Sequence, residues 1–357
     1  MNTPTTSKGL LAAQFLRSLH AGNRDVMAAI GHAEAQIGSQ HRSMIVEALK
    51  STIGGITAGD APALTYPIGL DFTGFLSPQT AIGRLALRPV PANCRVLSGD
   101  AAATAWWSGS GQAVPLSAGS LDAITVRPYP ISTVVVMTKE TLEFSGPIGN
   151  TMVRDALAAP MAAAQDQAFL DPASAGTPEL TPPAVTYGAP SRASTGQSVS
   201  AIDADLQAVE GLFFAAGGNL ARAVYVLAPR SAIFLAGLRT SGGALAFPNL
   251  GINGGFIHGL PAIVATGMPV TGSPGETAIA LLDPSRISIA DDGRTDFEIG
   301  MSTSLQMLDN PTNNSDTGTA TTMVSMFQTG SLAVKITRWC NWSAASGSAA
   351  VLTGVLY

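Results

Sequence analysis

The stretch DDGRTDFE places four carboxylates within eight positions of the chain. Oxygen ligands spaced along a glycine-containing turn are the kind of ligands that Ca²⁺ takes in proteins. The spacing here does not match the pattern of a calcium-binding loop, and a solvated turn is the preferred interpretation. The four residues are Asp291, Asp292, Asp296 and Glu298.

Cysteine and histidine, the other common metal ligands, are sparse. Cys94 and Cys340 lie far apart in the sequence, so they cannot build a disulfide framework, and two cysteines alone do not make a typical zinc site. His20, His32 and His41 lie far from either cysteine and form no H-E-x-x-H pattern. We expect solvated histidines, buried free thiols in a reducing compartment, and neither a metal nor a cofactor.

The sequence patterns of nucleophilic and phosphate chemistry do not assemble. SGSGQ, residues 108–112, has the wrong spacing for G-x-S-x-G, and none of the four lysines follows a glycine-rich turn. His258, in IHGLP, could serve as a general base, but nothing near it in the sequence completes a triad. A histidine beside a turn glycine is more often a structural hydrogen-bonding residue. We predict that the chain is not an enzyme.

The composition indicates surface that must be covered. Of the 357 residues 46% are hydrophobic and only 12% are charged, against about 25% charged in ordinary soluble proteins. The most apolar run, residues 221–238, is broken by Arg222, Pro229 and Arg230, and is no membrane span. Contacts with neighbouring subunits are therefore the better explanation. The net charge of −5 argues against a general nucleic-acid binder.

The spacing of apolar residues predicts the elements. Residues 1–50 read as helical, 51–77 as an extended arm without a regular element, and 82–137 as strands that pair as a hairpin with a loose tip. Val134, Val135 and Val136 suit a buried strand. Further predictions are a helix over 147–170 kinked at Pro160, a loop at 173–200, a helix over 202–214, a buried strand in RAVYVLAP, a short helix in RSAIFLAGLR, a strand pair around Asp283-Pro284, and a strand in GSLAVKITRWCNWS.

Two of the four tryptophans lie together in AWWSGSGQAVPLS, beside a glycine- and serine-rich stretch. In residues 60–342 the order of segments resembles the major capsid proteins of tailed bacteriophages, which have the Hong Kong 97 type of shell fold. The run from AWWSGSGQ to ETLEFSG is similar to that family's hairpin return, and VRDALAAPMAAAQDQAFLDP to its spine helix. AVYVLAP, GFIHGLPAIVATGMP, AIALLDPSRISIAD and LAVKITRWCNW are similar to its axial-domain strands and closing strand.

The resemblance implies an α+β fold, the Hong Kong 97-like capsid fold. It also implies the division of the chain. The expected parts are an N-terminal helical segment at 1–50, an N-arm at 51–77, an extended β-hairpin loop at 78–132, a peripheral domain at 133–199 with the spine helix at 147–170, an axial domain at 200–325, and a closing strand with the C-terminus at 326–357.

By the same resemblance, the chain assembles with itself, as pentamers and hexamers, into an icosahedral virion shell around double-stranded DNA. It would enclose DNA without sequence-specific binding, be made in the host bacterial cytoplasm, use no membrane, and have as partners a portal and separate scaffolding, protease or cement proteins. Adjacent tryptophans on a strand point to opposite faces, which favours intersubunit contact over a core position beneath a loop. The expected contacts are Phe72, Phe75, Arg88, Trp106, Trp107 and Pro115.

Two features depart from the family pattern. Residues 82–132 contain no lysine, so we predict that the shell is not covalently cross-linked. About 50 residues precede the arm, which leaves open a short internal scaffold, a separate scaffolding protein, or a chain already trimmed; Met1 argues against trimming. An encapsulin-like compartment holding protein cargo and a β-rich surface adhesin, which would need an export signal, are the alternative functions.

Overall fold

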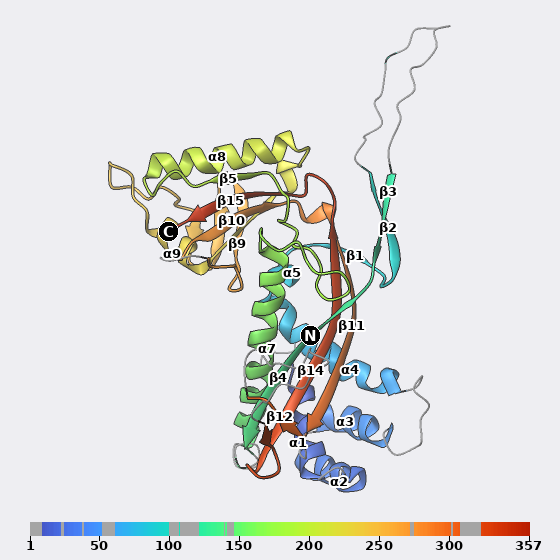
Figure 1. The fold of residues 1–357 in the computed structure, drawn as a ribbon. Coiled ribbons are helices and arrows are strands. Elements are labelled where there is room, and N and C mark those ends of the chain that lie inside the picture. Colours follow the sequence, from blue (N-terminus) through green and yellow to red (C-terminus); the bar gives the residue numbers. More distant parts are fainter. Residues whose placement is uncertain are drawn as a thin grey trace. The chain divides into compact units, whose positions relative to one another are not determined.

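The computed structural model describes residues 9–22, 25–37, 39–51, 61–99, 107, 121–138, 140, 146–271, 275–300, 303–307 and 323–357. The chain divides into two compact units, and each is assembled from three separate stretches (Figure 1). The first unit comprises Met1–Leu76, Ile131–Met161 and Gly293–Trp339. The second comprises Ser77–Pro130, Ala162–Asp292 and Cys340–Tyr357.

Helices form the N-terminal part of the first unit, as predicted for residues 1–50. Asp25 begins one of them, because its side chain accepts a hydrogen bond from the backbone N–H of Met27. The prediction that 51–77 lacks a regular element is wrong over α4, where Phe72 and Leu76 are fully buried. Packing of α4 against α1 and α3 outweighs the low helix propensity of Pro67 within it. The four helices are α1 (Leu10–Ala21), α2 (Val26–Gln36), α3 (Ser39–Ser51) and α4 (Ala61–Leu76).

The long helix α7 (Gly146–Leu170) confirms the predicted helix over 147–170. Val153, Leu157 and Met161 recur every four residues along it and are buried, as an amphipathic helix requires. Pro160 lies inside the helix, and a kink at this residue stays a prediction.

A four-stranded sheet has the order β1-β11-β14-β4. In β4 the prediction of a buried strand is wrong, because Val134 is exposed and its two valine neighbours are half-buried. Among the described residues β4 is an edge strand, and its alternating exposed and half-buried positions are those of a strand with one face toward solvent. The strands are β1 (Arg88–Val90), β4 (Tyr129–Thr138), β11 (Ile287–Gly300) and β14 (Ser331–Ala344), and β12 (Ser304–Leu305) pairs separately with β13 (Val324–Ser325).

The second unit is built on a sheet in the order β5-β15-β10-β6-β9-β8-β7, with α8 (Val199–Ala215) lying across it (Figure 1). Ile202, Leu206, Val209 and Phe213 form the fully buried stripe of α8, which confirms the predicted helix over 202–214. The predicted strand β6 and short helix α9 (Pro229–Gly237) are also confirmed. The strands are β5 (Ser191–Ala193), β6 (Val224–Leu227), β7 (Leu250–Gly251), β8 (Gly254–Ile257), β9 (Leu260–Val264), β10 (Thr277–Leu282) and β15 (Ala349–Val355).

The strands around Asp283-Pro284 do not pair with each other, contrary to the prediction. β10 belongs to the seven-stranded sheet and β11 to the four-stranded one. A 3₁₀ turn over Pro284–Arg286 separates them, and the Asp283 carboxylate caps it by accepting from the backbone N–H of Ser285. The acidic stretch DDGRTDFE lies in β11, so its interpretation as a turn is also wrong.

The predicted hairpin is confirmed in its described part. β2 (Cys94–Gly99) pairs antiparallel with β3 (Leu121–Val126), from Cys94 opposite Val126 to Gly99 opposite Leu121. The strands begin later than predicted, because residues 81–84 form the helical turn α5 (Ala81–Arg84), which Thr80 caps. Trp106 and Pro115 lie outside the described residues.

Candidate functional site

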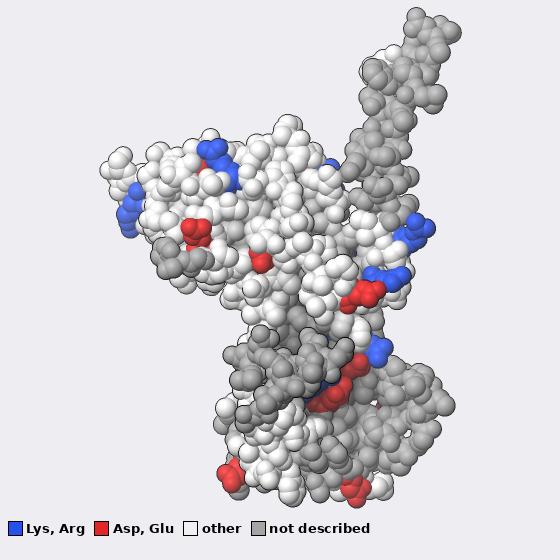
Figure 2. All heavy atoms as spheres, in the orientation of Figure 1, with Lys and Arg blue, Asp and Glu red and all other residues white. Residues whose placement is uncertain are grey.

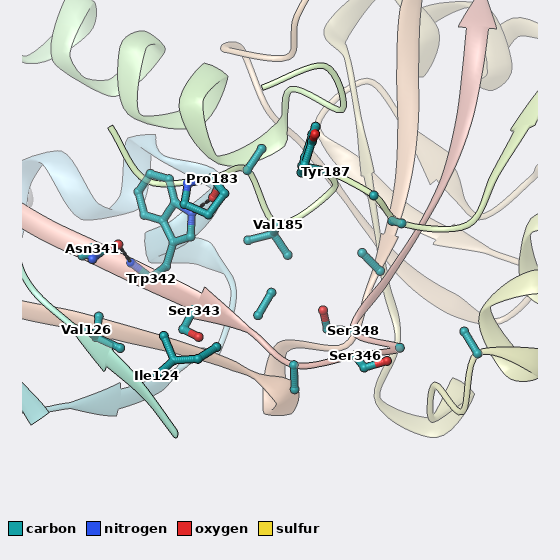
Figure 3. Close-up of a pocket in the computed structure, with 18 of the residues that line it drawn as sticks. Ile124, Val126, Pro183, Val185, Tyr187, Asn341, Trp342, Ser343, Ser346 and Ser348 are labelled. Atoms are coloured by element: carbon teal, nitrogen blue, oxygen red, sulfur yellow. Dashed lines mark hydrogen bonds between the residues drawn. The ribbon is translucent and has the colours of Figure 1, made fainter. Parts of the chain in front are cut away.

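A cavity of about 670 Å³ opens beside the base of the hairpin in the second unit (Figure 3). Three stretches supply most of its wall: residues 124–126 of β3, the loop at 183–190, and residues 341–349, which lead from β14 into β15. None of the lining residues carries a charge, and serine, alanine, glycine and proline predominate. Such a wall suits an uncharged partner better than an ionic one.

Trp342 holds two of these wall segments together. Its indole Nε1 donates a hydrogen bond of 2.8 Å to the carbonyl of Pro183, which Figure 3 shows as a dashed line. The ring also meets Phe169 edge-on, with centroids 5.3 Å apart. Beside it, the amide of Asn341 donates to the carbonyl of Arg127, which ties the end of β14 to the chain leaving the hairpin.

Sequence reasoning missed Trp342, since it weighed only Trp106 and Trp107. The partner that gives Trp342 its role, Pro183, lies 159 positions away in the chain. The one local signal is the pattern RWCNW in a strand segment, which predicts buried aromatics without identifying what they contact.

Two predicted contact residues lie on α4 in the first unit. Phe72 is fully buried, with its ring 6.0 Å from that of Phe297 in an edge contact, so it presents no surface to a neighbouring chain. Phe75 is half-buried, and the guanidinium of Arg154 lies 3.8 Å above its ring centroid. This cation–π contact uses one face of the Phe75 ring within the unit.

Two other predicted contact residues are exposed. The side chain of Trp107 is fully exposed, and Arg88 is exposed on β1, where the strand pairs in parallel with residues 288–290 of β11. Among the described residues, the predicted contacts therefore form no single site.

Two buried carboxylates in the second unit have shifted pKa values. Burial raises the pKa of Asp166 to about 7, although its Oδ1 accepts a 2.8 Å hydrogen bond from the backbone N–H of Ala81. Burial opposes ionisation of Asp205 as well, but hydrogen bonds from Thr195 and Arg192 outweigh it and hold the pKa of Asp205 below its usual range. The Asp166 carboxylate joins α7 to the first residue of α5, and the Asp205 carboxylate joins α8 to Thr195 and to Arg192 of β5.

The described residues offer neither a metal site nor a membrane-spanning helix. No group of three or more histidine, cysteine, aspartate or glutamate side chains there could hold a metal ion. Within the same ranges no helix has the length and hydropathy needed to cross a membrane. Cys340 is buried as expected, whereas Cys94 is only half-buried, and the two form no disulfide. Uncharged side chains dominate the described part of the face shown in Figure 2.

The sequence matches a family model described as "Phage capsid family" over residues 86–335. It is also 30% identical over 370 residues to the "Capsid polyprotein" of Pseudomonas phage PAJU2, a similarity that covers 99% of this chain. The chain spans 55% of the length of that relative.

Solved structures with a similar fold come from phages and a related particle. A chain from Mycobacterium phage Ogopogo has a TM-score of 0.56 at 16% identity, covering 77% of this chain and 92% of its own. One from Gordonia phage Cozz has a TM-score of 0.55 at 16% identity, covering 77% and 86%. One titled "Capsid of empty GTA particle computed with C5 symmetry" has a TM-score of 0.51 at 14% identity, covering 78% and 90%. At these identities the likeness concerns the fold alone.

Proposed function

We propose that this chain, which belongs to the phage capsid family, is the major structural protein of the shell of a tailed bacteriophage. The observation that carries the proposal is the family match over residues 86–335, which spans both units of the structure. The α+β Hong Kong 97-like fold expected from the sequence is confirmed by the structural similarities. An encapsulin-like compartment and a surface adhesin are not favoured by these comparisons.

The finer proposal concerns assembly. Copies of the chain join as pentamers and hexamers into an icosahedral virion shell that encloses double-stranded DNA, after synthesis in the host cytoplasm. The low charge content supports large subunit contacts, and a net charge of −5 suits a wall that must not adhere to DNA. A portal and separate scaffolding, protease or cement proteins complete the set of partners. The assignment of 51–77, 78–132, 133–199, 200–325 and 326–357 to arm, loop, peripheral domain, axial domain and closing segment stays a prediction.

The proposed intersubunit surface includes Trp107 and Arg88, together with the uncharged cavity beside the hairpin. Exposed aromatic side chains are frequent energetic anchors of protein interfaces, which supports this role for Trp107. Trp106, Pro115 and Phe75 stay predicted contacts. Phe72 is withdrawn from the set because its side chain is fully buried within its own unit.

The test is to express the full chain, separate the products by size exclusion and image them by negative-stain electron microscopy. Closed shells, or isolated pentamers and hexamers, are expected. A monodisperse monomer that stays monomeric with its own phage's scaffolding protein would overturn the proposal. Shells that consistently enclose a specific enzyme in place of DNA would support the compartment instead.

The contact surface is tested with paired variants. Trp107→Ala should reduce assembly and leave the thermal unfolding of the unassembled subunit unchanged, because its side chain is fully exposed. Trp342→Phe should lower the unfolding temperature of the unassembled subunit, because Trp342 is buried. Unimpaired assembly of Trp107→Ala would remove Trp107 from the proposed surface.

A further inference from the structure

A tight turn joins β8 to β9 in the second unit. Ile257 pairs with Leu260 across it, so the turn has two central residues, His258 and Gly259. Both have positive φ, 50° and 81°, which is the conformation of a type I′ turn. This turn type most favours Asn-Gly, and asparagine and histidine are among the non-glycine residues that adopt positive φ most often. The turn therefore accommodates the histidine, and the role of the ring depends on what it contacts.

The imidazole of His258 lies between two carboxylates of α8. Its Nδ1 is 2.9 Å from Oε1 of Glu210, and its Nε2 is 3.0 Å from Oδ1 of Asp203. Asp203 and Glu210 are seven positions apart, about two helical turns, so they project from one face of α8. Each ring nitrogen thus has its own carboxylate.

The surroundings of the ring supply hydrogen-bond donors to these carboxylates. Tyr225, buried on β6, donates from its hydroxyl to the same Oε1 of Glu210 at 2.8 Å. Burial, and the negative charge of Glu210, raise the pKa of Tyr225, so this hydroxyl keeps its proton. Gln207, one turn along α8, donates to the other oxygen of Asp203 at 2.9 Å. Among the described residues, the titratable groups in contact with the ring or with its carboxylates are Asp203, Glu210 and Tyr225.

Only one charge state of the ring satisfies both contacts. A neutral imidazole has one N–H and one acceptor nitrogen, whereas the imidazolium donates from both nitrogens. In the neutral state one nitrogen lone pair would face a carboxylate oxygen at about 3 Å. We propose that His258 is a pH-dependent clasp whose protonated ring fastens the β8–β9 turn to α8, and whose deprotonation releases one of the two attachments.

The clasp acts on a segment that presents an apolar side chain at the protein surface. Phe256, two residues before His258 on β8, is 54% exposed. Firm attachment of the turn fixes the strand that carries this apolar side chain, and release loosens it. The inference stands on the contacts within the second unit and does not depend on the proposed shell function.

Hydrogen–deuterium exchange of the full-length protein tests the clasp. Exchange of the segment 254–264 is compared between wild type and His258→Asn at about pH 5.5 and about pH 8, which bracket the usual titration range of histidine. Asparagine suits the type I′ turn, so the hairpin should survive the substitution. At the acidic pH the variant should exchange roughly tenfold faster than wild type, as expected for the loss of a charge-assisted hydrogen bond. At the basic pH the ratio should fall but stay above one, because the neutral ring keeps one of the two attachments.

Further variants separate the clasp from a merely structural role. Asp203→Asn and Glu210→Gln should each reproduce part of the acidic-pH effect, because each removes one charged acceptor. His41→Asn is the control, since the Nδ1 of His41 faces the amide oxygen of Gln14 at 3.0 Å instead of a carboxylate. An exchange ratio that is the same at both pH values would overturn the proposal. So would Asp203→Asn and Glu210→Gln variants that both exchange at the wild-type rate at the acidic pH.

Discussion

Replacing Asp166 by asparagine should remove the part of the pH dependence of stability that this buried carboxyl contributes. Asp166 lies on α7 with its side chain fully buried in the second unit. Burial raises its pKa from 3.8 to about 7, against the opposing influence of the backbone N–H groups of Ala81 and Ile82 and the positive charge of Arg84. Asp166→Asn keeps an acceptor oxygen for the Ala81 N–H and has no charge to bury.

The magnitude follows from the shift. Because the pKa is higher in the folded state, the folded state binds the proton more tightly. The stabilisation is fully present below the unfolded value of 3.8 and is lost as the pH rises through about 7. Between about pH 5 and about pH 8 the wild type should therefore lose about 3 kcal/mol of unfolding free energy from this group. The variant should lack this loss.

Urea denaturation followed by tryptophan fluorescence measures the difference, with the protein at one fixed concentration in every arm. The control is Asp155→Asn on the same helix, whose carboxylate is 58% exposed beside Arg154 and should leave the pH dependence as in wild type. If Asp166→Asn and wild type differ by the same free energy at both pH values, the carboxyl does not titrate in the folded protein as argued.

Three further expectations concern the cavity wall, the second buried carboxylate and the shell. Trp342→Phe should lower the free energy of unfolding by about 1–3 kcal/mol, because the Pro183 carbonyl loses its donor, and urea titration measures this. Asp205→Asn should destabilise by about 2–3 kcal/mol at neutral pH. Since the pKa of Asp205 is lowered, that difference should shrink as an acid titration passes below pH 4. Assembled particles should run as single-chain bands on denaturing gels, because residues 82–132 contain no lysine; a ladder would contradict this.

Elements with strong local patterns could be predicted from the sequence. The buried stripe of α8, from Ile202 to Phe213, repeats at helical spacing, and its N-cap Ser198 begins the helix. The helix α4 could not be predicted, because Pro67 and nearby glycines lower its propensity and the burial of Phe72 and Leu76 depends on other helices. Local patterns carry no information about packing of that kind.

The site was harder to predict than the elements, for a related reason. Trp107 attracted attention by its neighbours in the sequence, whereas Trp342 gains its role from a carbonyl 159 positions away. The environment of Asp166 likewise depends on Ala81, 85 positions away. The contacts of His258 with α8 span 48 and 55 positions, so the sequence could indicate a structural histidine without naming its partners.

The interleaving of the two units constrains when the protein can fold during its synthesis. The chain passes between the units five times, and β15, residues 349–355, lies between β5 and β10 in the seven-stranded sheet. The ribosome therefore makes most of this sheet before the strand that joins β5 to β10 exists. Folding of the second unit must await residues near its carboxyl end, and pairings of such long sequence separation form slowly. A chain whose synthesis stops before Ala349 lacks a completed second unit, which keeps prematurely terminated products from adopting the native fold.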